Sequence, residues 1–217
     1  MTRMLLAAIV ASTLFAGCID YEQKTRLEAD GSGEMTIHYW AKESLVSWLG
    51  KNRFPFTEDE VRAKYGAIHG VTVGSVDVRE RTDDSTRHVT FDLRFDDITA
   101  LSKQPGFESA VFAWKEDGAT MVFTQTMHAD EGSTSDGLQQ FSVTYEYTFP
   151  GEIVEHNATS VSGSTAVWKL RLSDLGTTRS LTAKVRLGQS WTMTIVLSAI
   201  LLLVLVVFWW LLRRKRH

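Results

Sequence analysis

The sequence predicts an α+β fold, with an antiparallel β-sheet of hairpins, two or three short helices packed on it, and one C-terminal transmembrane helix. Three observations lead to this prediction. Segments such as 88–95 and 140–149 alternate apolar and polar residues, as strands buried on one face do. Short segments with helical spacing occur between the strands but do not alternate with them one for one. The final apolar run, 193–212, contains no charged residue, proline or glycine.

The C-terminal run is long enough to cross a membrane, because about 20 helical residues rise roughly 30 Å. Aromatic residues stand near both of its ends, and basic residues follow directly, which is typical of a cytoplasmic end. A buried core helix is the alternative, but such a helix is rarely apolar on all faces. We predict a transmembrane helix over 190–212 and a basic cytoplasmic tail over 213–217. The residues that carry this prediction are Trp191, Trp209, Trp210, Arg213, Arg214, Lys215 and Arg216.

The N-terminus predicts a second anchor. Arg3 precedes an apolar run, 4–15, that is too short to span a bilayer and is typical of a signal peptide. The run ends in Leu-Phe-Ala-Gly-Cys, which resembles the bacterial lipobox. The resemblance implies that residues 1–17 are removed and that lipid is attached to Cys18. The alternative is an ordinary signal peptide that is cleaved nearby and leaves a free thiol.

The two ends predict one topology. A signal peptide exports the chain that follows it and the basic tail stays inside, so residues 18–189 should form an exported domain. This domain would lie on the outer side of the bacterial cytoplasmic membrane. It contains 18 of the Lys and Arg residues and all 26 Asp and Glu residues, a net charge near −8 (18 minus 26). That balance argues against nucleic acid as a partner. Cys18 is the only cysteine, so no disulfide and no cysteine-based metal site is expected.

Turn residues divide the domain into strands and hairpins. Segments 152–157 and 165–172 are expected to pair as one hairpin. In segment 71–80, strict alternation places Val71 and Val73 on one face and Val76 and Val78 on the other. The expected strands, in chain order, are 19–30, 34–41, 71–80, 88–95, 109–114, 119–127, 140–149, 152–157, 165–172 and 179–187.

Short helices are expected over 42–51, from Thr57 to about Tyr65, and over 96–103. Thr57 with Glu60 three residues later is the pattern of a capping box. The first two helices and the loop between them are rich in large apolar side chains. These side chains form either ordinary core or a groove that faces lipid or a partner, since large apolar surface patches usually mark binding sites. The residues of this candidate groove are Trp48, Leu49, Phe54, Phe56 and Tyr65.

The sequence contains no recognisable catalytic motif. Its six histidines are dispersed, and no pair has a spacing that would bring two metal ligands together. A nucleophile elbow, a phosphate-binding loop and a glycine-rich dinucleotide turn are all absent from the sequence. We therefore expect a protein that is not an enzyme and takes no cofactor or metal ion.

The order of short motifs resembles that of the LppM-like lipoproteins. The motifs are the lipobox at Cys18, the turn 30–34 (Asp-Gly-Ser-Gly-Glu), 149–152 (Phe-Pro-Gly-Glu) followed by Asn157, 166–168 (Ala-Val-Trp), and the C-terminal membrane helix with its basic tail. The resemblance implies an exported α+β domain that binds lipids or glycolipids of the cell envelope, and it supplies no catalytic residue. The leading hypothesis is a membrane-anchored, lipid-binding envelope lipoprotein. The competing hypothesis is a tethered scaffold that binds another envelope protein.

Overall fold

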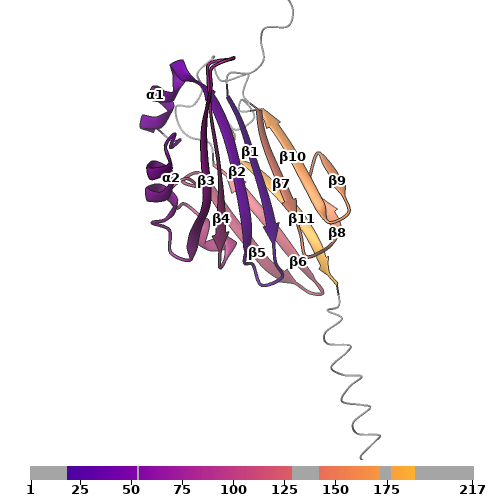
Figure 1. Ribbon diagram of the computed structural model, residues 1–217. Coiled ribbons are helices and arrows are strands. Elements are labelled where there is room, and N and C mark those ends of the chain that lie inside the picture. Colours follow the sequence, from indigo (N-terminus) through magenta and orange to yellow (C-terminus); the bar gives the residue numbers. More distant parts are fainter. Residues whose placement is uncertain (1–18, 53, 129–141, 172–176, 189–217) are drawn as a thin grey trace, which may run out of the picture. The chain divides into compact units, whose positions relative to one another are not determined.

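The computed structural model describes residues 19–52, 54–128, 142–171 and 177–188 (Figure 1). The chain up to Arg186 forms one compact unit, and the fold described below is that of this unit. Its elements are β1 (Ile19–Leu27), β2 (Gly33–Lys42), α1 (Glu43–Asn52), α2 (Glu58–Tyr65), β3 (Val71–Arg81), β4 (Thr86–Phe95), η1 (Ile98–Leu101), β5 (Ala110–Asp117), β6 (Thr120–Met127), β7 (Ser142–Thr148), β8 (Gly151–His156), β9 (Ser160–Ser162), β10 (Thr165–Arg171) and β11 (Arg179–Leu187).

The fold is α+β, as predicted, and the structure shows that it is mostly β, with two sheets rather than one. The strand order is β3-β4-β2-β1-β7-β10-β9 in the seven-stranded sheet and β5-β6-β11-β8 in the four-stranded sheet. The purely antiparallel expectation was wrong, because β1 and β7 pair in parallel, from Asp20 opposite Ser142 to Arg26 opposite Thr148. Turn residues predict only which sequence neighbours pair, and more than 100 residues separate these two strands.

The expected hairpin between 152–157 and 165–172 was also wrong. Strand β8 belongs to the four-stranded sheet, whereas β10 belongs to the seven-stranded sheet. The partners of β10 are β7 and the short strand β9, which precedes the turn at Gly163. Residues 157–159 therefore carry the chain from one sheet to the other.

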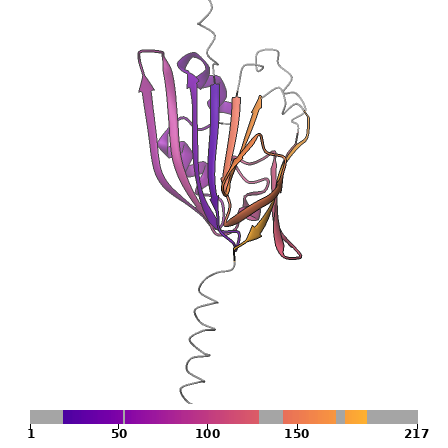
Figure 2. The ribbon, with the colours of Figure 1, turned by 90° about the vertical axis from the view of Figure 1, so that its right-hand side faces the viewer.

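One face of the seven-stranded sheet, which we call the inner face, is covered from β3 to β10. Strands β4 and β7 alternate as predicted, with Phe91 and Tyr147 among the side chains that are fully buried on this face. Helices α1 and α2 cover its β3–β4–β2 part, where the rings of Tyr65 and Phe91 lie 4.7 Å apart (Figures 1 and 2). The four-stranded sheet covers its β1–β7–β10 part, where the rings of Phe123 and Tyr147 lie 4.4 Å apart. The opposite face of the sheet is called the open face.

A β-bulge in β3 makes the alternation of its side chains differ from the predicted one. The four valines of this strand share the inner face, because Val73 pairs with Leu93, Val76 with Phe91 and Val78 with Val89, and these partners are all buried. The register shifts between Val73 and Val76, where Gly74 and Ser75 add one residue to the strand. The prediction that Val76 and Val78 oppose Val71 and Val73 was therefore wrong.

The helix predictions were confirmed, with one change of type. Thr57 Oγ1 accepts a hydrogen bond from Glu60 N at 3.3 Å, and Glu60 Oε2 accepts one from Thr57 N at 3.1 Å, which completes the capping box of α2. The third helix is the 3₁₀ turn η1, capped by Asp97. Within the described residues, no helix is both long and apolar enough to cross a bilayer. Cys18 and the predicted span 190–212 lie outside the described residues.

Candidate functional site

Four residues of the predicted groove, Leu49, Phe54, Phe56 and Tyr65, lie in or between helices α1 and α2, which cover the inner face. Leu49, Phe56 and Tyr65 are buried, with exposed fractions of 6%, 3% and 4%, and Phe54 is half-buried. The side chain of Trp48 is outside the described part of the chain. Phe54 and Phe56 pack against Tyr39, whose ring lies 5.1 Å from that of Phe54 and 5.6 Å from that of Phe56.

The hydroxyl of Tyr39 has a hydrogen-bond partner in the loop between the two helices. The hydroxyl of Tyr39 donates a hydrogen bond to the carbonyl oxygen of Pro55. Burial raises the pKa of Tyr39 and of Tyr65 far above the usual tyrosine value, so both hydroxyls stay neutral. For Leu49, Phe56 and Tyr65 these contacts are those of a hydrophobic core, which is the first of the two interpretations. A groove beside Trp48 stays a prediction.

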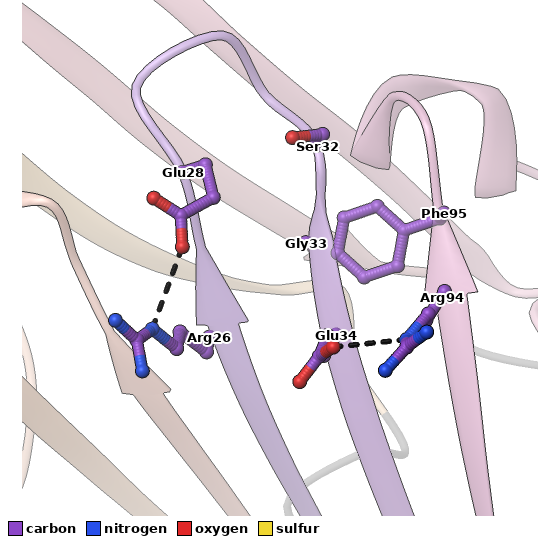
Figure 3. A pocket seen from close by; sticks show the side chains of 7 residues that line it. All are labelled: Arg26, Glu28, Ser32, Gly33, Glu34, Arg94 and Phe95. Carbon is purple, nitrogen blue, oxygen red and sulfur yellow. Dashed lines mark hydrogen bonds and ion pairs between the residues drawn. The ribbon is translucent and has the colours of Figure 1, made fainter. Parts of the chain in front are cut away.

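A pocket of about 400 Å³ opens at the end of the β1–β2 hairpin (Figure 3). The turn that connects the two strands needs its glycines. Gly31 has φ +89°, and a Cβ atom on Gly33 would lie 2.8 Å from the ring of Phe95. The hydroxyl of Ser32 donates to Asp30 at 2.6 Å and closes the turn. The residues that line the pocket are Arg26, Glu28, Ser32, Gly33, Glu34, Arg94 and Phe95.

Two ion pairs make up the charged wall of this pocket. Arg26 Nε lies 3.4 Å from Glu28, and Arg94 Nε lies 2.9 Å from Glu34. Both arginine side chains are about three-quarters exposed, at 74% and 77%. Because the ion pairs engage Nε, the terminal nitrogens of each guanidinium can still donate to an anion. Phe95, whose ring is buried, also lines the pocket.

The sequence analysis missed this pocket. Arg26 and Glu34 are cross-strand partners in β1 and β2, and Glu34 is the partner of Arg94 in β4. The turn at 30–33 makes the first pairing readable from the sequence. The second pairing joins strands that are about 50 residues apart, and no local pattern predicts it. Among the described residues, no group of three or more His, Cys, Asp or Glu side chains is arranged to hold a metal ion.

Asn157, which belongs to the motif after Phe-Pro-Gly, joins the two sheets. Its Oδ1 accepts hydrogen bonds from Trp168 Nε1 and from Thr182 N, both at 2.8 Å. Its Nδ2 donates to the carbonyl oxygen of Ser180 at 2.7 Å. Trp168 lies in the seven-stranded sheet, whereas Ser180 and Thr182 lie in the four-stranded sheet. Asn157 therefore has a structural role, because its side chain links the two sheets.

The variant Asn157→Ala is expected to lose about 2 kcal/mol of unfolding free energy, since the indole N–H of buried Trp168 loses its acceptor. Thermal unfolding of the full chain in detergent should then show a Tm lower by about 4–8 °C. Thr159→Ala is the control, because the Thr159 hydroxyl accepts one exposed hydrogen bond, from Lys169 N. Equal Tm values for the two variants would contradict the assigned role of Asn157.

Comparison with known proteins agrees with the motif order noted in the sequence. The model of the LppM domain matches residues 57–186, more than half of the chain. The structure is similar to the NMR structure of the folded domain of the Mycobacterium tuberculosis LppM protein, with a TM-score of 0.51 and 17% sequence identity. The similarity covers 82% of this chain and 94% of that domain, and at this identity it shows the fold alone. No match was found among curated proteins. The chain belongs to the LppM domain family.

Proposed function

We propose that the chain is a non-enzymatic envelope lipoprotein, anchored in the cytoplasmic membrane at both ends, whose exported domain binds lipid. Membership of the LppM domain family supports a lipoprotein-type domain. Attachment of lipid at Cys18 and the transmembrane span 190–212 are parts of the proposal, and both rest on the sequence.

The charge pattern of the pocket is the observation that supports the proposal of lipid binding. Arginine is well suited to bind phosphate, because its planar guanidinium donates parallel hydrogen bonds to phosphate oxygens. The carboxylates of Glu28 and Glu34 provide acceptors for an ammonium group within the same pocket. A volume of about 400 Å³ is in the usual range for small ligands. These features fit a headgroup with both a phosphate and an ammonium group, as in phosphatidylethanolamine.

The place of the pocket in the fold also supports a lipid ligand. Trp114 Nε1 donates to the carbonyl oxygen of Ala29 in the β1–β2 turn, at 3.1 Å. Trp114 is the register partner of Phe123, which is the partner of Ala183 in the middle of β11. The pocket therefore lies at the end of the fold toward which β11 runs. Only two residues, 188 and 189, separate β11 from the predicted span.

The variant Arg94→Gln tests this function. It removes the guanidinium but keeps a polar side chain, and it should weaken binding of short-chain phosphatidylethanolamine by about tenfold or more, the value of one charge-assisted hydrogen bond. Native mass spectrometry of the full chain in detergent, titrated with this lipid, measures the change.

Arg79→Gln is the matched control. Arg79 forms a similar exposed ion pair, with Asp77 at 2.7 Å, but it does not line the pocket. Its side chain is 76% exposed, against 77% for Arg94. If both variants bind the lipid as the natural chain does, the pocket is not its site.

A further inference from the structure

We propose that the exported domain lies on its side on the membrane, with the open face of the seven-stranded sheet against the lipid headgroups. The partner of this face is the outer leaflet of the membrane in which the chain itself is anchored. The inference rests on the proposed function, because it takes Cys18 and the span 190–212 as anchors in one membrane.

The start of β1 and the end of β11 lead to the two predicted anchors. Strand β1 begins at Ile19, the residue after Cys18, where β7 also begins. Strand β11 ends beyond Ala183, at the end of the fold that holds the β1–β2 turn. The beginning of β1 and the end of β11 thus lie at opposite ends of the two packed sheets, as Figure 1 shows.

The connections from the strand ends to the predicted anchors are shorter than the distance between those strand ends. Strand β1 has nine residues, so the two ends are about 30 Å or more apart along the strands. The connections are shorter: a single step joins Ile19 to Cys18, and residues 188–192 lead to the apolar run, so fully extended they reach about 20 Å together. A domain with its strands along the membrane normal cannot place both anchors in the membrane. The strands must therefore lie closer to the membrane plane than to its normal.

The lengths of the two connections also indicate which face of the domain meets the membrane. The shorter connection, at Cys18, belongs to β1 in the seven-stranded sheet, and the longer one belongs to β11 in the four-stranded sheet. Packed sheets are about 10 Å apart, so the single step at Cys18 cannot cross the four-stranded sheet to reach a membrane on its far side. On each side, β1 is three strands away from an edge of its sheet, about 14 Å. The open face is the surface that Cys18 reaches directly.

The charge of the open face fits an anionic or zwitterionic membrane. By register, eight basic and six acidic side chains of the described strands point outward on this face, a balance of +2 (8 minus 6). The whole exported segment has a net charge near −8 (18 minus 26). On the other side of the sheet, the first turn of α2 contains Glu58, Asp59 and Glu60. Electrostatics therefore favour the open face as the side that approaches the lipid.

Two local features of the open face also suit a lipid surface. Trp40 projects from this face and stacks on His88, with ring centroids 5.8 Å apart, and tryptophan is typical of membrane interfaces. Arg26, Glu34 and Arg94 of the pocket belong to the same face. A domain on its side would thus place the pocket at the level of the headgroups.

Three single-cysteine variants of the full chain test this orientation. A lipidated Cys18 has no free thiol, so an introduced cysteine takes a nitrobenzoxadiazole label alone. Thr90→Cys and Thr144→Cys lie on the open face, whereas Thr124→Cys lies on the outer face of the four-stranded sheet. All three threonines are half-buried strand residues, so they are closely matched.

The labelled chains are placed in vesicles of phosphatidylethanolamine and phosphatidylglycerol that contain lipid with a spin-labelled headgroup. Since at least one sheet spacing of about 10 Å separates the faces, quenching at Thr90 and Thr144 should exceed that at Thr124 by about twofold or more. Equal quenching at all three positions, or stronger quenching at Thr124, would overturn the orientation.

The mass of the mature chain separates this result from a failure of the proposed function. A mass without lipid on Cys18 overturns the double anchor, and the orientation falls with it. A lipidated chain in which Thr124 is quenched most keeps the double anchor and overturns only the choice of face.

Discussion

Replacement of Gly106 by alanine is expected to destabilise the exported domain by about 3–4 kcal/mol, because it adds a left-handed backbone penalty to overpacking of the core. Gly106 has φ +87°, and a Cβ atom there would lie 2.7 Å from Cζ and 2.8 Å from the hydroxyl oxygen of Tyr65. Tyr65 cannot move aside freely, since its ring packs against Phe91 at 4.7 Å and Phe107 at 5.9 Å.

Thermal unfolding of the full chain in detergent, followed by tryptophan fluorescence, measures this effect as a Tm lower by about 6–16 °C. Gly118→Ala is a matched control, because Gly118 also has a positive φ, +62°, but nothing lies within 4 Å of an added Cβ atom. That variant should lose only about 1 kcal/mol. A similar Tm for Gly106→Ala and Gly118→Ala would show that Tyr65 is not held as described.

Removal of the Tyr147 hydroxyl is expected to cost about 2–4 kcal/mol, since it withdraws a partner from two buried amides. This hydroxyl accepts a hydrogen bond from Gln23 Nε2 at 2.9 Å and donates one to Gln125 Oε1 at 2.7 Å. The exposed fractions of Gln23 and Gln125 are 1% and 2%, and they come from different sheets. Burial raises the pKa of Tyr147 well above its usual value, so the hydroxyl remains a donor at neutral and mildly alkaline pH.

Tyr147→Phe and the double variant Tyr147→Phe/Gln125→Met test this account together. Methionine is similar in length to glutamine but needs no hydrogen bond, so the double variant should recover part of the stability that Tyr147→Phe loses. The measurement is again the Tm of the full chain in detergent. Additive losses in the double variant would mean that the Gln125 amide was not left without a partner.

Local patterns in the sequence were sufficient where the structure depends on local chemistry. The alternation of 88–95 and 140–149 identified the inner face of β4 and β7, because a strand has a side-chain period of two. Thr57 and Glu60 located the start of α2, because a capping box satisfies backbone N–H groups within four residues. The order of the motifs also pointed to the LppM family, which the match over 57–186 confirmed.

Strand partners far apart in the chain could not be read in the same way. The parallel pairing of β1 with β7, the separation of β8 from β10 and the bulge at Gly74 all depend on contacts between distant segments. The bulge shows the reason most clearly: all four valines of β3 can point to the inner face only if one extra residue breaks the period of two.

The sequence by itself determined that this chain has an α+β domain with short helices, and it predicts the two membrane anchors. Only the tertiary structure decided what the aromatic residues near α1 and α2 do. Leu49, Phe56 and Tyr65 are buried against the inner face, and Arg26, Glu34 and Arg94 meet in a pocket. The physical reason is that hydrophobic periodicity shows which side of an element is apolar, whereas the packing of distant elements decides whether that side is covered.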